Sequence, residues 1–172
     1  METKPVKPAV YGLIISLVLI VFNLVVYFTH QMENRPLGSV SFLILIGGII
    51  YGCIEYAKQN NGNVTFGNVF AHGFKITAVV IVIQALYTVL SIKVLFPDII
   101  DITIDTARKK MIEEGKATPE QIQQGLDMTR KFFMPFAIGG IIIAFGVVGA
   151  IASAIGAAVA KKNPQAQNPF QQ

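Results

Sequence analysis

Charged residues are scarce in this chain of 172 residues. They make up 14% of the sequence, against about 25% in ordinary soluble domains, while 53% of the residues are hydrophobic and the mean hydropathy is +0.58. The apolar residues lie in long uncharged runs, so they are not simply the core of a large soluble domain. This composition argues against a soluble fold and predicts a membrane protein.

Cysteines and basic clusters are also few. Cys53, the single cysteine, lies in a hydrophobic run, so an intramolecular disulfide and a multi-cysteine metal site are excluded and an inert buried thiol is expected. The net charge of +4 comes from scattered lysines and arginines that are not interleaved with aromatic residues. This pattern argues against nucleic acid as a partner.

Four apolar segments are long enough to cross a bilayer, whose hydrocarbon core of about 30 Å needs roughly 20 helical residues. The predicted fold is therefore all-α, a polytopic membrane protein with four transmembrane helices. The first segment is interpreted as a retained helix, because it is longer than the apolar part of a signal peptide and no small-residue cleavage site follows it. The predicted spans are residues 9–29, 38–56, 69–96 and 132–160.

A polar insert, residues 98–131, separates the third and fourth spans. Its apolar residues recur at helical spacing and predict an amphipathic helix that Gly115 can end. Thr118 then begins a second helix, because Pro119 occupies the first position and Gln121 completes a capping box. We therefore expect a short helical hairpin outside the bilayer.

The fourth span is longer than one crossing needs, so tilt, a kink at Pro135 or an interfacial start must absorb the excess. Pro97 follows the third span and ends it. Residues 1–160 are thus expected to form a single four-helix membrane domain. Residues 161–172 form a polar tail that contains proline and is expected to be disordered.

Small residues recur at helical spacing in the second and fourth spans. Because lipid supplies no hydrophobic drive for helix association, such residues let two helices approach closely. They predict packing either inside the same bundle or against another copy of the chain. The predicted helix-packing residues are Gly48, Gly52, Gly146, Gly149, Ala150, Ser153, Ala154 and Ala157.

The stretch NNGNVTFGNVFAHGFK, residues 60–75, resembles several functional motifs. A phosphate-binding loop is excluded, because Gly67 is not followed by the lysine and the serine or threonine that bind phosphate and magnesium. The glycosylation sequon at Asn63 lies on the cytoplasmic side in the topology that we expect. Thr65 is instead predicted to cap the third helix, with an apolar stripe of Phe66, Val69, Phe70, Gly73 and Phe74.

The polar strip opposite this stripe is the one candidate functional or interfacial cluster. It comprises Asn68, His72 and Lys75, with Glu55 at the end of the second span as the nearest acidic residue. His72 could carry protons, but ionisable residues near span ends more often anchor a helix at the interface. The sequence shows no nucleophile with a base and no metal-ligand spacing, so no catalytic, cofactor-binding or metal residue is predicted.

Both termini are expected in the cytoplasm. With four spans, they share one face of the membrane with the second loop. The other face carries eight basic residues, but four of these lie in the middle of the insert, far from the span ends. Without those four, six basic residues remain on the face of the termini and four on the other, and the positive-inside rule favours the first as cytoplasmic.

Several segments resemble one family when taken in order. They are YGLIIS, then GCIEYAKQNNGNVTFGNVFAHGF, a proline after the third span, TPEQIQQGLDMTRK and GVVGAIASAIGAAVAKK. Together they resemble the bacterial membrane proteins of the family called domain of unknown function 4199, typical of Bacteroidetes. Ala57 departs from the family pattern, which has a basic residue there. The resemblance implies four spans in the inner membrane and brings no activity or substrate.

We therefore expect an integral inner-membrane protein without enzymatic activity that acts through helix packing or partner binding. Its expected partners are the lipid bilayer and either a second copy or another membrane protein. One alternative is a small oligomeric transporter or channel, which would need Asn23, Gln84 and Thr88 to meet at mid-membrane. The other is an accessory or sensory subunit whose helical insert binds a partner.

Overall fold

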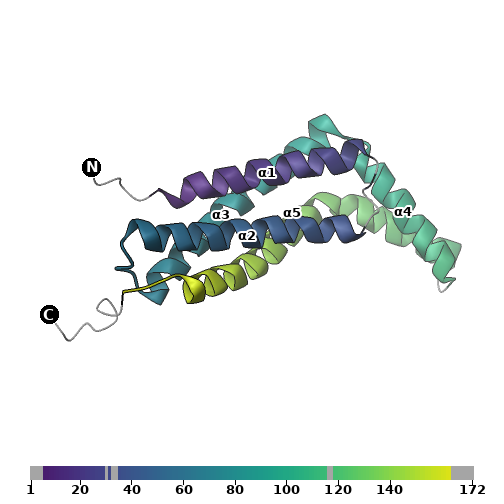
Figure 1. The fold of residues 1–172 in the computed structure, drawn as a ribbon. Helices are drawn as coiled ribbons and strands as arrows, with labels where there is room; N and C mark the ends of the chain where they lie inside the picture. The colour runs from purple at the N-terminus through teal and green to yellow at the C-terminus, as the bar shows by residue number, and fades with distance from the viewer. Residues whose placement is uncertain (1–5, 30, 32–34, 116–117, 164–172) are drawn as a thin grey trace. The chain divides into compact units, whose positions relative to one another are not determined.

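The computed structural model describes residues 6–29, 31, 35–115 and 118–163, and these residues contain helices and no strands (Figure 1). Four helical stretches are long and apolar enough to cross a membrane: Pro8–Phe28, Leu37–Gln59, Phe66–Leu95 and Pro119–Val159. They confirm the prediction of an all-α fold and indicate a multi-pass membrane protein. The elements are α1 (Pro8–Phe28), α2 (Arg35–Gln59), α3 (Phe66–Leu90), the π-helical turn η1 (Ser91–Leu95), α4 (Ile99–Glu114) and α5 (Pro119–Val159).

The predicted helix ends follow local chemistry. The Asn68 backbone N–H donates to Thr65 Oγ1 at 3.2 Å, so Thr65 caps α3 as expected. Gly115 ends α4 with a left-handed φ of 62°. At the start of α5, Thr118 Oγ1 accepts from the Gln121 N–H at 3.3 Å while Gln121 Oε1 accepts from the Thr118 N–H at 2.9 Å, which is the predicted capping box.

The second half of the chain differs from the sequence prediction in one respect. The predicted second helix of the hairpin and the fourth span are a single helix, α5, of 41 residues. Pro135 lies inside this helix and does not end it. Apolar helices tolerate an internal proline because neighbouring groups can satisfy the carbonyl that loses its donor. Much of the predicted tail, residues 164–172, lies outside the described residues.

The chain divides into two compact units, residues 1–84 with 143–172 and residues 85–142. The first unit contains α1, α2, most of α3 and the second half of α5. Its apolar core includes Leu45, Ile49, Val69, Ile76 and Val80, all fully buried. At one end of this unit the Val6 N–H donates to Gln59 Oε1 at 2.7 Å and the Asn163 N–H donates to the Gly62 carbonyl at 2.8 Å. The described ends of the chain therefore lie beside the α2–α3 turn (Figure 1).

Glycines bring the helices of the first unit into close contact. A methyl group on Gly73 of α3 would lie 2.6 Å from Cys53 Sγ of α2 and 2.7 Å from Ser153 Oγ of α5, closer than atoms can pack. Gly48 of α2 meets Ile15 of α1 in the same way. Six glycines make such contacts: Gly12, Gly48, Gly52, Gly73, Gly149 and Gly156. Packing at these points depends on the absence of a side chain.

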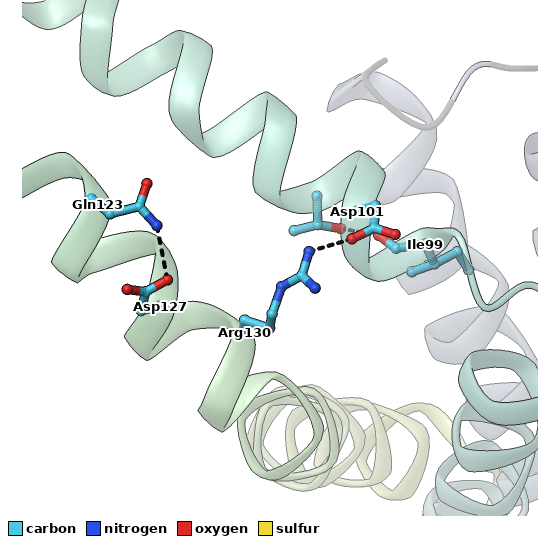
Figure 2. A network of polar contacts seen from close by, with 6 residues as sticks. Ile99, Asp101, Gln123, Asp127 and Arg130 are labelled. Atoms are coloured by element: carbon cyan, nitrogen blue, oxygen red, sulfur yellow. Dashed lines mark hydrogen bonds and ion pairs between the residues drawn. The ribbon is translucent and has the colours of Figure 1, made fainter. Parts of the chain in front are cut away.

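The second unit pairs α4 with the first turns of α5. Met111 of α4 packs on Gly125 of α5, with 3.4 Å between its methyl carbon and the position of a Cβ on that glycine. Arg130 forms an ion pair with Asp101 at the other end of α4, so the two segments run antiparallel (Figure 2). Figure 2 also shows Gln123 donating to Asp127 along α5, at 3.0 Å. Both partners of the ion pair are exposed, so this pair orients the segments and stabilises them little.

We expect Gly73→Ala to destabilise the first unit by about 1–3 kcal/mol, because the new methyl group overlaps two buried atoms on two other helices. The melting temperature of the purified protein in detergent measures this loss. Gly67→Ala is the matched control, since its Cβ would meet only Thr65 Oγ1 at 3.9 Å. Alanine favours a helix over glycine, so Gly67→Ala should leave the melting temperature unchanged or raise it. Equal melting temperatures for the two variants would contradict the packing argument.

Candidate functional site

His72, the candidate for proton chemistry, lies in the interior of the first unit. Only 6% of the residue is exposed. Its ring stacks on Tyr56 of α2, with centroids 4.1 Å apart, and meets the edge of Tyr11 of α1 at 6.1 Å. Its Nε2 atom has no hydrogen-bond partner in the described part of the chain. His72 is therefore held by aromatic packing between two helices.

The prediction that His72 lies on a polar strip opposite the buried face of α3 is wrong. The buried face of α3 includes Val69, His72, Gly73 and Thr77, while Phe66 and Phe74 face outward with 49% and 47% of their surface exposed. In a soluble protein the face of a helix that carries the large apolar side chains packs against the core. The prediction for α3 applied this rule. In lipid the outer face is apolar as well, so small and polar residues can occupy the interior instead.

The other members of the predicted polar cluster do not join His72. Glu55 forms an ion pair with Lys58 one turn further along α2, at 2.6 Å. Asn68 and Lys75 are both exposed on α3. The structure thus places Asn68 and Lys75 on the outside of the first unit, Glu55 partly buried in an ion pair, and His72 inside the unit.

A small group of reactive side chains surrounds Gly73, but each one bonds to a backbone. Cys53 Sγ donates to the Val69 carbonyl at 3.7 Å, and Ser153 Oγ donates to the Gly149 carbonyl of its own helix at 2.6 Å. Such bonds satisfy a buried hydroxyl or thiol within the helix bundle. A nucleophile activated by a base would need its proton directed at that base. The first bond links α2 to α3 and the second stays within α5, and neither joins a nucleophile to His72.

A polar link that the sequence analysis did not anticipate joins α3 to α1. Gln84 Nε2 donates to the Ser16 carbonyl at 3.1 Å, and both residues are buried. Asn23, by contrast, is exposed and lines a separate cavity of 180 Å³ between the end of α1 and the start of α2. A transport path would need Gln84 and Asn23 to meet. Gln84 is buried between α1 and α3, whereas Asn23 is exposed beside the cavity, so these two residues do not form one path. Periodicity cannot identify the Gln84 link, because its acceptor is a backbone carbonyl.

The predicted packing residues separate into two sets. Gly48, Gly52, Gly149, Ser153 and Ala157 lie within the bundle; Gly149, for instance, faces Thr77. The neighbouring ridge on α5 is different: Gly146, Ala150 and Ala154 are only half-buried. Apart from the neighbouring residues and backbone of its own helix, no atom of the described residues lies within 4 Å of the position that a Cβ on Gly146 would occupy. One ridge of α5 thus packs inside the unit and the other lies at its edge.

Comparison with known proteins identifies a family. The model of this family matches residues 10–162, which include every residue of the interior described above. No curated protein and no solved structure shows a significant match to the chain. The family match confirms the resemblance found in the sequence: this chain belongs to the family described as "Protein of unknown function (DUF4199)".

Proposed function

We propose that this protein is a non-enzymatic integral protein of the bacterial inner membrane. It acts by packing its helices against a second membrane protein, and the simplest such partner is another copy of the chain. The observation that carries the proposal is Gly146. A glycine inside a helix makes the helix less stable than an alanine would, by about 0.5–1 kcal/mol. In membranes, such small residues permit the close approach of another helix.

Gly146 differs in this respect from the six close-packed glycines of the first unit. Those six each face a side chain of another helix, whereas the space around Gly146 is open. Ala150 follows it by one helical turn and is half-buried. Together these two residues offer an outward-facing small surface of the kind that already joins α5 to α2 and α3.

The interior of the first unit supports a function in helix packing and argues against a transport path through a single chain. Gln84 is bonded to the Ser16 carbonyl, and the helices touch at glycines that leave no room for a methyl group. A transport path at mid-membrane would need polar groups that remain available to a substrate. Close contact between helices is instead the main feature of this interior.

The length of α5 supports an extramembrane hairpin. Its 41 residues would extend about 60 Å, roughly twice the hydrocarbon thickness of a bilayer. The N-terminal part carries the charged residues Glu120, Asp127, Arg130 and Lys131. We therefore propose that this part lies outside the bilayer with α4, on the face opposite two cytoplasmic termini.

Reporter fusions test this orientation. A fusion at Gly115, between α4 and α5, should give a periplasmic signal, and a fusion at the C-terminus should give a cytoplasmic one. The basis is the excess of lysines near the span ends on the side of the termini. A cytoplasmic signal at Gly115 would overturn the orientation.

Cysteine crosslinking in native membranes tests the packing surface. We expect Ala150→Cys, in a Cys53→Ala background, to form a covalent dimer on mild oxidation, because the ridge of Gly146 and Ala150 would face its counterpart in a second copy. Removing Cys53 leaves no other thiol in the chain. Ile155→Cys is the control, since Ile155 lies on the opposite side of α5 with 44% of its surface exposed.

The yields of the two cysteine variants distinguish the alternatives. A dimer from Ala150→Cys that clearly exceeds the dimer from Ile155→Cys supports the ridge. Equal yields would indicate random collision in the membrane and would contradict the proposed surface. Gly146→Leu should also abolish the Ala150→Cys dimer, because the leucine would keep the second helix away. It should not lower the melting temperature, because no side chain among the described residues of the same molecule meets a Cβ at this position.

A non-enzymatic role also predicts that His72 can be replaced by an apolar ring. His72→Phe retains the stacking on Tyr56 and removes a buried nitrogen that has no partner among the described residues. The melting temperature should stay the same or rise, because an unsatisfied buried polar atom costs about 1–3 kcal/mol. The crosslinked dimer should persist. Loss of the dimer at an unchanged melting temperature would show that His72 does more than fill space.

A further inference from the structure

A cavity lined by lysines lies at the end of the first unit where the described chain ends meet the α2–α3 turn. We call it the lysine cavity; its volume is 330 Å³, and Lys58, Lys161 and Lys162 line it together with Asn61, Gly62 and Asn163. The Asn163 N–H bond to the Gly62 carbonyl holds the C-terminal wall against the turn. The cavity is therefore built from two segments that are far apart in sequence, residues 57–62 and residues 161–163.

The charge of the lysine cavity is strongly positive. Among the described residues, its lining includes three lysines and no acidic residue. Glu55, which is not part of the lining, pairs with Lys58. Lys162 donates to the carbonyls of Ala157 and Ala160 at the end of α5, and these neutral acceptors leave its charge uncompensated.

Lys161 has no structural role of this kind. It is exposed and forms no hydrogen bond or ion pair with the residues that the structure describes. Lys162 also stabilises the end of α5, so a stabilising function alone accounts for that residue. A stabilising function does not account for Lys161, nor for the cavity that Lys161 and Lys162 line together with Lys58.

The lysine cavity adjoins the ends of two helices that are long and apolar enough to cross a membrane, α2 at Gln59 and α5 at Val159. Lysines that follow directly after a span lie where lipid phosphates do, and basic pockets between membrane helices bind anionic headgroups. The cavity thus offers positive charge at the level of the phosphates.

A row of three phenylalanine rings leads from the cavity along α3, and its two end rings are exposed. Lys162 Nζ lies 5.8 Å from the centroid of the Phe66 ring. Phe66 stacks on Phe70 at 6.4 Å, and Phe70 stacks on Phe74 at 6.1 Å. The row covers about 12 Å of helix, which is long enough to contact much of one acyl chain within a leaflet.

We propose that the lysine cavity binds the phosphate of an anionic phospholipid and that the phenylalanine row binds one of its acyl chains. The positive lining favours a phosphodiester without a compensating positive headgroup over a zwitterionic lipid. The adjoining row, in which Phe66 and Phe74 are exposed and Phe70 is partly buried, favours a lipid over a free phosphate ion, because an ion has no apolar part to place there. This assignment does not rest on the function proposed above.

Native mass spectrometry of the full-length protein in detergent tests the site, with phosphatidylglycerol and phosphatidylcholine of the same chain length as probes. We expect phosphatidylglycerol to bind with at least roughly tenfold preference. Lys161→Gln should weaken it roughly fivefold, and the Lys58→Gln/Lys161→Gln double variant roughly 25-fold. Lys75→Gln, which removes an exposed lysine outside the cavity, is the matched control and should retain wild-type binding.

The remaining measurements separate the lipid from a soluble anion and from a folding defect. Phe74→Ala should weaken binding of the long-chain lipid, and inorganic phosphate should bind far more weakly than the lipid. The variants should melt at the wild-type temperature in lipid-free detergent, because Lys161 and Phe74 are exposed. Inorganic phosphate binding as tightly as phosphatidylglycerol would overturn the lipid assignment. Equal effects of Lys161→Gln and Lys75→Gln would overturn the site itself.

Discussion

Close approach of helices at small residues is the constraint on which the interior of the first unit depends. Lipid tails are as apolar as the side chains they contact, so burial of apolar surface does not hold membrane helices together as it does in water. At Gly73, α3 touches Cys53 of α2 and Ser153 of α5 at once. Dispersion contacts between such closely packed atoms, together with polar links such as the one from Gln84 to the Ser16 carbonyl, supply the attraction that remains.

The same constraint explains why several polar residues of the spans lie inside. Ser16, His72, Thr77, Gln84 and Ser153 are all buried, while the outer faces carry Leu, Ile, Val and Phe. Three of these five residues donate to backbone carbonyls, so they join helices or close turns without exposing a polar group to lipid. His72 instead relies on the faces and edges of two tyrosines. Large apolar side chains therefore cover the outside of the unit, as they do not in a soluble domain.

The fold could be predicted from the sequence further than the candidate site could. Span length, Pro97 and the caps at Thr65 and Thr118 are local signals, and each one predicted an element or its end. The continuity of α5 was missed because a capping box and a long apolar run were interpreted as separate helices. His72 was misplaced because the apolar stripe was assigned to the interior by a rule for soluble helices. The lysine cavity was not anticipated, since Lys58 and Lys161 meet only through the tertiary fold.

The late position of α5 in the chain has a consequence for biosynthesis. Domains form from the N-terminus onward during synthesis, and α2 and α3 are joined by a short turn through Asn61 and Gly62, both with positive φ. These two helices can therefore enter the membrane as a pair while α5 is still being made. Until Gly149, Ser153 and Gly156 arrive, the groove around Cys53 and Gly73 has no third wall. The contact that closes the bundle is therefore supplied by the last helix of the chain to be made.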